Sequence, residues 1–332
     1  MAGYNTIRGL KVKYLSADPA GAEAGQVWYN STTGTLRVDS ILNAAAWASA
    51  PAPNRKNGAA TGGGTPTAAI LSGNYGYNGS KTAEAEEWDG SGWTNIASIP
   101  STNQGYNFGC GTVSDFSSMG GGYGPPVPGS TAVFDWDGSG WTTGASFTTP
   151  GCIQAGVCGP GQNALLCGGS GPGFAGRLNT TCERTGASWT NTGLLSTARD
   201  SLNVSGTKGE AIASGGNSPP QVLVVESYNG SSWAAETALP SARGVAGEAG
   251  TGSSDQFLFG GESGSGSIAT SVRYNGTSWS ADASLATVRQ ILGGFGTSTA
   301  ALCAAGSSPV PSTTSETYSG GSLAPVKNIS TS

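Results

Sequence analysis

The chain has 332 residues, with 11% charged and 36% hydrophobic side chains, 56 glycines and a formal net charge of −5. A chain with this hydrophobic content and so few charges is not expected to be disordered by charge repulsion. The 15 Lys and Arg residues form no basic run, which argues against nucleic-acid binding. No apolar stretch reaches the roughly 18 residues of a membrane-spanning helix, so we expect no membrane insertion.

Residues 1–44 differ from the rest of the chain. The segment TIRGLKVKYLS (6–16) alternates apolar and polar side chains, and GQVWYNSTTGTLRVDSI (25–41) is typical of a β-hairpin. The first residues lack the apolar core of a secretory signal. A segment this short rarely builds a stable core without a partner. We therefore predict a small N-terminal β module over residues 1–44 that attaches the chain to a partner.

From residue 45 onward one pattern repeats. A Trp follows a predicted turn at regular steps of 46, 48, 48, 44, 46 and 44 residues, with Leu in the last place: Trp47, Trp93, Trp141, Trp189, Trp233, Trp279 and Leu323. Each unit contains a small-residue strand, an apolar strand ending in a glycine pair such as QFLFGG (256–261), a variable loop, and two further strands. Four short strands in about 45 residues predict an all-β chain, with a six-bladed β-propeller over residues 45–328.

The turn before each Trp predicts how the outer strands pair. Asn229-Gly230 favours a two-residue type I′ turn, which places Tyr228 opposite Ser231. Tyr228 and Trp233 are then diagonal neighbours on one sheet face. We predict that such aromatic pairs pack between neighbouring blades, where one buried aromatic removes roughly 150–250 Å² from water.

A ring needs its ends to meet, because an open sheet edge exposes unpaired backbone groups. The segment WASAPAPNRKNG (47–58) looks like a fourth strand and a corner that precede the first complete blade. We predict that residues 45–53 supply the outer strand of the last blade. The alternative is that SLAPVKN (322–328) fills this position.

Two resemblances add to this interpretation. The glycine pairs, the Tyr…Trp pairs and the Pro/Ala-Arg corners resemble kelch repeats over residues 47–323, although the turn between Tyr and Trp is shorter. The segment GQVWYNSTTGTLRV (25–38) is similar to short motifs in tail and other structural proteins of bacteriophages. The resemblances imply a kelch-like propeller located in the virion, with residues 1–44 contacting other virion proteins and with several copies in the assembly.

The chain has no His, which removes the commonest general base and most transition-metal sites. We expect no enzymatic activity, no metal and no cofactor. Four acids occupy what we take to be one repeated blade position, which favours a structural role over a catalytic pair: Glu86, Glu183, Glu226 and Glu316. A carbohydrate-active propeller enzyme and a cytosolic kelch-type interaction scaffold remain alternatives.

Two groups of residues are candidates for ligand binding. Arg199, Arg243 and Arg289 each lie ten residues after a Trp, at corners near the rim of the central channel. They either pair with an acid or carbonyl of a neighbouring blade or form an anion or sugar site. The loops after the glycine pairs vary most, and recognition often uses variable loops on a rigid scaffold. Their aromatic residues could stack on a host-surface glycan or cover their own blades: Tyr75, Tyr77, Tyr123 and Phe174.

Overall fold

A computed structural model describes residues 12–17, 27–38, 45–55, 58, 61–75, 81–101, 105–122, 130–147, 153–171, 176–307 and 310–320. These residues belong to two compact units. One consists of residues 1–46 with 320–332, and the other of residues 47–319.

The smaller unit contains a three-stranded sheet in the order β1 (Lys13–Leu15), β2 (Val27–Asn30), β3 (Thr35–Val38). Strands β2 and β3 form the hairpin predicted from the alternating pattern, and β1 runs parallel to β2. Asn30 supports the turn, because its Oδ1 accepts the backbone N–H groups of Thr32 and Thr33 at 3.1 Å. Trp28 is buried, whereas Tyr14 is 76% exposed and lies 4.9 Å from Tyr29 between ring centroids.

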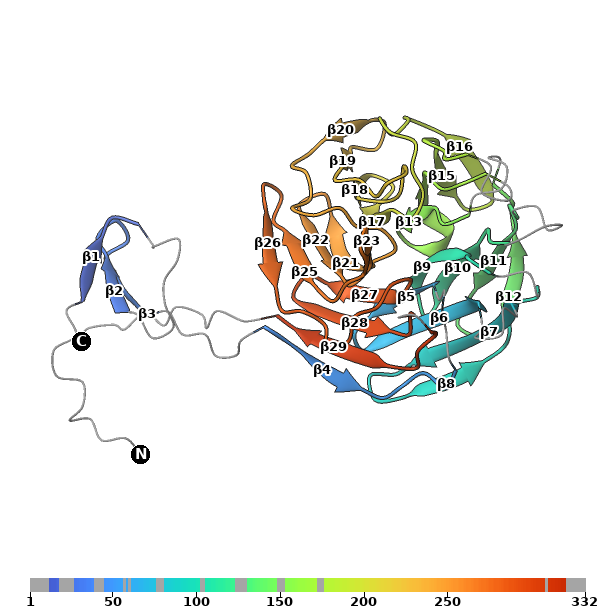
Figure 1. Cartoon of the computed structure of the whole chain (residues 1–332), viewed down its shortest axis with the longest axis horizontal. Helices are drawn as coiled ribbons and strands as arrows, with labels where there is room; N and C mark the ends of the chain where they lie inside the picture. Colours follow the sequence, from blue (N-terminus) through green and yellow to red (C-terminus); the bar gives the residue numbers. More distant parts are fainter. Residues whose placement is uncertain are drawn as a thin grey trace. The chain divides into compact units, whose positions relative to one another are not determined.

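The larger unit is a six-bladed β-propeller, as the repeat predicts, and each blade is a four-stranded antiparallel sheet (Figure 1). From the innermost to the outer strand, the first three blades are β5 (Thr61–Thr65), β6 (Ala68–Tyr75), β7 (Lys81–Trp88), β8 (Trp93–Ile96); β9 (Phe108–Thr112), β10 (Asp115–Met119), β11 (Val133–Trp136), β12 (Trp141–Gly144); and β13 (Gly156–Cys158), β14 (Leu165–Cys167), β15 (Thr181–Thr185), β16 (Ser188–Asn191).

The last three blades are β17 (Asn203–Thr207), β18 (Glu210–Ser214), β19 (Val225–Tyr228), β20 (Trp233–Ala235); β21 (Gly247–Gly252), β22 (Asp255–Phe259), β25 (Ser271–Tyr274), β26 (Trp279–Asp282); and β27 (Gly293–Thr297), β28 (Ala300–Ala304), β29 (Ser315–Ser319), β4 (Ala46–Ala50). A 3-10 turn, η2 (Gly161–Asn163), lies in blade 3, and a small hairpin of β23 (Glu262–Ser263) and β24 (Gly266–Ser267) follows the second strand of blade 5.

The ring is completed in blade 6, whose outer strand comes from the beginning of the repeat region. Strand β4 lies beside β29, and the Trp47 indole donates its Nε1–H to the Ala283 carbonyl of blade 5 at 2.9 Å. The Trp47 ring also lies 5.2 Å from that of Tyr318 and 4.8 Å from that of Phe259. Residues 322–328, the alternative, lie outside the described residues.

The outer hairpins correct the predicted two-residue turn. Tyr228 lies directly opposite Trp233 as the last strand pair, so four residues form the loop, within which the backbone N–H of Asn229 bonds to the Ser232 carbonyl. Asn229 Oδ1 accepts the backbone N–H groups of Ser231 and Ser232, both at 3.0 Å. This side-chain acceptor stabilises the longer loop, a use of Asn that the Asn-Gly pattern alone does not distinguish from a type I′ turn.

The third blade is also out of the predicted register. Its hairpin pairs Arg184 with Trp189, so Cys182, not Glu183, occupies the position of Glu226 in blade 4. Glu183 instead accepts a hydrogen bond from the Tyr228 hydroxyl of the next blade at 2.6 Å.

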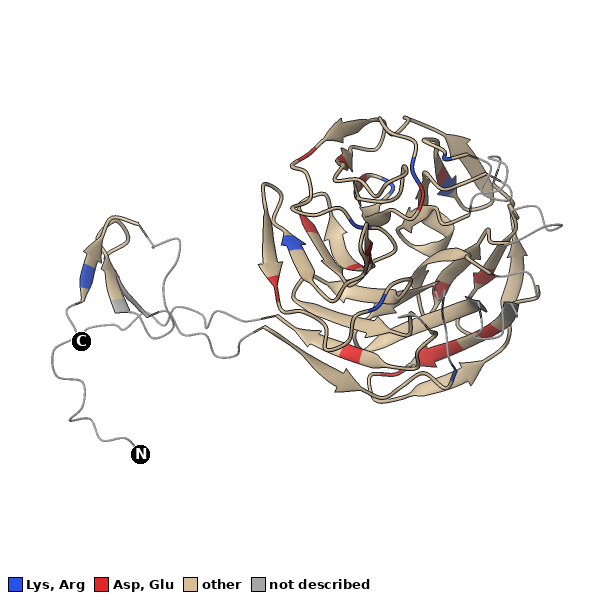
Figure 2. Cartoon of the chain, in the orientation of Figure 1, with Lys and Arg blue, Asp and Glu red and all other residues tan. Residues whose placement is uncertain are grey.

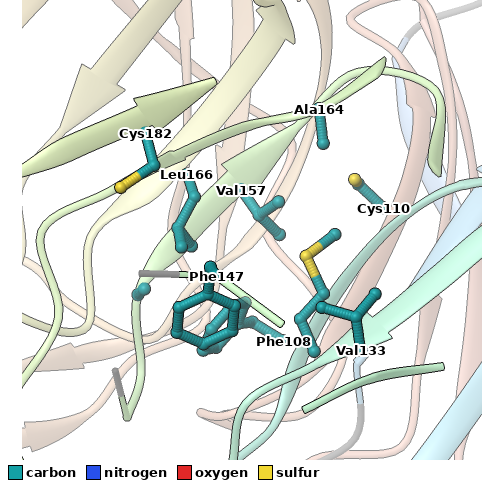
Figure 3. Packing of buried hydrophobic residues seen from close by; sticks show 10 residues of the cluster. Phe108, Cys110, Val133, Phe147, Val157, Ala164, Leu166 and Cys182 are labelled. Atoms are coloured by element: carbon teal, nitrogen blue, oxygen red, sulfur yellow. The ribbon is translucent and has the colours of Figure 1, made fainter. Parts of the chain in front are cut away.

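Neighbouring blades are joined by their tryptophans and by dry cores. The indole N–H of an outer-strand Trp donates to a carbonyl just after the outer strand of the preceding blade in four places: Trp141 to Ala97, Trp189 to Ala145, Trp279 to Thr237 and Trp47 to Ala283. Figure 3 shows the core between blades 2 and 3, where Phe108 and Val133 face Val157 and Leu166. Each blade therefore depends on its neighbours to bury its two sheet faces.

Candidate functional site: the channel mouth

The corners that enter the innermost strands and the loops after the glycine pairs lie on the same face of the propeller. Isolated bridges pair Asp200 with Asn217, and Gln290 with Ser307. The glycine pair makes this possible, because Gly215 and Gly216 have φ of 62° and 99°. A Cβ at Gly215 would lie 2.3 Å from the Arg243 carbonyl oxygen. In blades 4 and 6, the beginning of the variable loop therefore lies beside the corner at the mouth of the central channel.

Around this mouth, five of the described residues occupy equivalent corner positions and form a strained ring. Their φ angles lie between 48° and 58°, a region that non-glycine residues seldom adopt: Tyr106, Gln154, Ser201, Val245 and Ile291. Each such conformation costs on the order of 1–3 kcal/mol and persists only where the surroundings enforce it.

Hydrogen bonds between blades enforce this conformation. The backbone N–H of Ser201 donates to the Gln154 carbonyl at 2.8 Å, that of Val245 to Ser201 at 2.9 Å, and that of Ile291 to Val245 at 2.8 Å. The positive φ turns each N–H toward the preceding blade. The side chains of the ring are thereby held in fixed positions at the mouth.

The ring and the first residues of the innermost strands enclose a cavity of about 130 Å³. Its lining mixes apolar side chains, such as Phe108 and Leu292, with the polar side chains of Thr61, Asn107 and Asn203. A second cavity of about 140 Å³ continues into the channel, lined mostly by glycines of the innermost strands. A concave site with apolar walls and a few converging polar groups is the usual form of a ligand site.

Glu248 on β21 is the one acid among the residues that line these two cavities. The side chain is partly buried and its Oε2 is fully buried, with no hydrogen-bond donor among the described residues. Burial raises the pKa of the Glu248 carboxyl to about 8, although Asn203 and the backbone of Val204 favour the charged form. Among the described residues, no Lys or Arg lines these cavities, so none of them neutralises the charged carboxylate there.

The three predicted arginines are placed inside the blades, away from the cavity lining. Each is at most 1% exposed. Arg199 forms an ion pair with Glu226 at 2.9 Å and donates to the Val224 carbonyl at 2.7 Å. Arg289 pairs in the same way with Glu316 and the Thr314 carbonyl. Pairing with an acid or a carbonyl, the first of the two interpretations, describes all three, because Arg243 donates to the Thr270 carbonyl at 3.1 Å.

Two members of this arrangement lack their expected partner. In blade 5, Val272 occupies the position of Glu226, so Arg243 has no carboxylate, and burial lowers the pKa of its guanidinium to about 10. In blade 1, burial raises the pKa of Glu86, whose Oε2 accepts the Asn54 backbone N–H at 2.9 Å while Oε1 has no partner among the described residues. Figure 2 shows how few basic residues the blades contain and how they are separated.

The predicted aromatic platforms stay a prediction. Tyr75 ends strand β6, where its backbone pairs with Lys81. Tyr77, Tyr123 and Phe174 lie outside the described residues. Neither the strained ring nor Glu248 was predicted from the sequence. Glu248 could have been noticed, since it is the single charged residue in the six innermost strands, which otherwise contain small, apolar or hydroxyl and amide side chains.

Metal binding, membrane insertion and similarity to known proteins also bear on the function of this chain. Among the described residues, no group of three or more His, Cys, Asp or Glu side chains is placed to hold a metal ion. No helix in the described part of the chain is long and apolar enough to cross a membrane. The chain matches no protein-family model, and a search of curated proteins finds no similar sequence.

Proposed function

We propose that this chain is a non-enzymatic structural protein of a bacteriophage virion, a kelch-like propeller that binds a host-surface glycan at the channel mouth. The observation that carries the recognition role is the cavity of about 130 Å³ inside the strained ring, on the face where the loops vary most. A comparable apolar cavity holds a single six-membered ring. Its hydroxyl and amide side chains match the hydrogen-bonding groups of a sugar.

The attachment role rests on residues 1–44. The hairpin of β2 and β3 contains the segment that resembles phage structural proteins, and its small sheet leaves Tyr14 exposed. A small sheet with an exposed aromatic side chain gains stability when another chain covers it. Other virion proteins, or further copies of this chain in the assembly, would supply that cover.

Binding of the full-length protein to an array of bacterial surface glycans tests the recognition role. We expect a Gln154→Ala, Ser201→Ala double variant to lose at least tenfold in affinity, because both side chains line the cavity. Thr277→Ala, a change on an outer hairpin, is the matched control and leaves binding intact. Glycan binding that the double variant retains would contradict the proposed site.

Particle incorporation tests the attachment role. A chain lacking residues 1–44 keeps strand β4 and should fold, but it should be absent from purified particles that contain the full-length chain. Incorporation of the truncated chain would refute docking through this segment. Recovery of the full-length protein from the cytosol with a soluble partner would favour the interaction scaffold.

A carbohydrate-active enzyme is the remaining alternative, and Glu248 offers a direct test of it. A carboxyl with a raised pKa can serve as a general acid. Release of reducing sugar from a bound glycan, abolished by Glu248→Gln, would replace the binding role with a catalytic one.

A further inference from the structure

Some residues that line the mouth cavity carry buried side-chain acceptors that receive no hydrogen bond from the described residues. Three side-chain oxygens of its lining residues are buried and receive no hydrogen bond from the described residues: Asn107 Oδ1, Asn203 Oδ1 and Glu248 Oε2. They come from blades 2, 4 and 5. Buried acceptors normally have donors, and each unsatisfied one costs on the order of 1–3 kcal/mol.

The orientation of the Asn203 amide identifies its free atom as an acceptor. Its Nδ2 donates to the Ala246 carbonyl at 2.7 Å, which leaves Oδ1 as the unpaired end. Asn203 is 4% exposed, and hydrogen bonding from its side chain and from the Val204 backbone lowers the pKa of the Glu248 carboxyl against the larger effect of burial. Two acceptors, one of them a carboxyl, therefore lie near each other with no cation among the lining residues.

We propose that the channel mouth selects an amino sugar, whose primary ammonium group donates to Glu248 and Asn203 while the ring hydroxyls contact the remaining polar side chains. An ammonium group offers three donors and one positive charge, which is what this set of acceptors lacks. This inference rests on the proposed glycan-binding role of the same cavity and names the chemical class of its ligand.

Two other cations fit the cavity less well. A hard metal ion such as Ca²⁺ takes six to eight oxygen ligands, often from several carboxylates, whereas the lining contains one carboxylate and several apolar walls. A lysine side chain has an apolar stem, which would offer no hydrogen bond to the polar lining residues Thr61, Gln154 and Ser201. A sugar ring uses both the polar and the apolar parts of the lining.

Binding of an ammonium ligand to Glu248 should release a proton to solvent, and both this release and its effect on affinity can be measured. With a pKa of about 8, Glu248 is roughly nine-tenths protonated at pH 7 in the free protein. An ammonium ligand binds the carboxylate, so the proton leaves to solvent and affinity rises with pH. Glu248 acts electrostatically on Cys158 on β13, whose thiol pKa burial raises well above its ordinary value. Cys158 therefore stays neutral over this range.

The test is calorimetric titration of the full-length protein with D-glucosamine, D-glucose and N-acetyl-D-glucosamine at pH 7. We expect glucosamine to bind at least tenfold more tightly than the other two, and Glu248→Gln to remove this preference. Glu262→Gln changes an acid of the same face that does not line the cavity, so it should preserve the preference. The two variants should melt within a few degrees of the wild type.

A second measurement does not depend on any variant. The probe is n-butylamine, which like a lysine amine stays charged from pH 6 to pH 9. Its affinity for the wild-type protein should rise more than tenfold between pH 6 and pH 8, with proton release at pH 7, while butan-1-ol shows no such rise.

Three outcomes would overturn the inference. Equal binding of glucose and glucosamine would show a neutral sugar site, which keeps the proposed function and removes the ammonium. No binding of any of the three sugars would exclude a small amino sugar, and glycan-array binding then tests the proposed function independently. Binding of butylamine in preference to glucosamine would identify an alkylamine, such as a lysine side chain, as the ligand group.

Discussion

At the scale of single residues, Glu248 is a carboxyl whose neutral form the fold favours. Its pKa is about 8 in the folded protein and ordinary, near 4.3, in the unfolded chain. Between these values the folded state binds more protons than the unfolded state. The contribution of Glu248 to stability is therefore present at low pH and is lost as the pH rises from about 5 to about 9.

This linkage predicts a pH dependence that one substitution removes. The free energy of unfolding should fall with rising pH by at most about 1.4 kcal/mol per pH unit through this group. In Glu248→Gln, a neutral isostere, denaturant midpoints between pH 5 and pH 9 should decline less. If the variant and wild-type profiles run parallel, Glu248 does not titrate as described.

Buried arginines provide a second prediction at this scale. Arg199 has Glu226 as its partner, and removing one member of a buried ion pair costs about 3–5 kcal/mol. Glu226→Val should therefore destabilise the protein strongly in urea denaturation. In blade 5, where Arg243 already lacks an acid, Val272→Glu supplies the missing partner and should raise the urea midpoint. Destabilisation by Val272→Glu would mean that Thr270 alone satisfies Arg243.

At the scale of elements, the repeated unit is a blade whose outer hairpin packs its two aromatic rings together and hydrogen-bonds to the preceding blade. The aromatic pair lies inside the hairpin, with Tyr274 and Trp279 5.0 Å apart between ring centroids. The tyrosine hydroxyl and the indole N–H then reach the preceding blade, where they bond to Glu236 and the Thr237 carbonyl. One hairpin thus supplies both the packing and the polar contacts of a blade interface.

The loop of that hairpin depends on one side chain. Asn275 Oδ1 accepts the backbone N–H groups of Thr277 and Ser278 at 3.0 and 2.9 Å. We expect Asn275→Ala to cost about 1 kcal/mol, because these amides lose their acceptor in the folded loop. Thermal melting measures the loss, and Thr277→Ala is the neighbouring control with little effect. An unchanged melting temperature would indicate that solvent replaces the Asn side chain fully.

Much of the element pattern was available from sequence. Glycine pairs, aromatic spacing and the Trp period predict four strands per unit and six units, and the structure has both. The register of the outer hairpins was predicted incorrectly, because Asn229-Gly230 is compatible with a two-residue and a four-residue loop. The structure distinguishes the two through the pairing of Tyr228 with Trp233 and through the backbone N–H groups of Ser231 and Ser232, which donate to Asn229 Oδ1.

At the scale of the whole molecule, the propeller is a ring that is closed by one strand from the start of the repeat region. Strand β4 lies beside β29, and Trp47 contacts Phe257, Phe259 and Tyr318. Without β4, the edge of β29 and these aromatic rings would be exposed to water. The last blade would then neither close the ring nor protect blade 5.

The closing strand therefore predicts a global effect. Deletion of residues 45–53 should lower the melting temperature markedly, and Trp47→Ala alone should cost about 3 kcal/mol, the lower part of the range for Trp→Ala changes. For a domain of this size that corresponds to a shift of roughly 6–12 °C. A deletion variant with wild-type melting would show that another segment fills the outer position.

The sequence by itself determined the β class, the number of blades and the order of strands within each blade, because these follow from local periodicity and from contacts between adjacent units. Only the tertiary structure decided which side chains meet at the channel mouth. Gln154, Ser201, Val245 and Ile291 come from successive corners about 45 residues apart, and a positive φ joins them through the backbone. That conformation is imposed by the closed ring and not by the residue types, which is why Val245 and Ile291 carry no local signal of it.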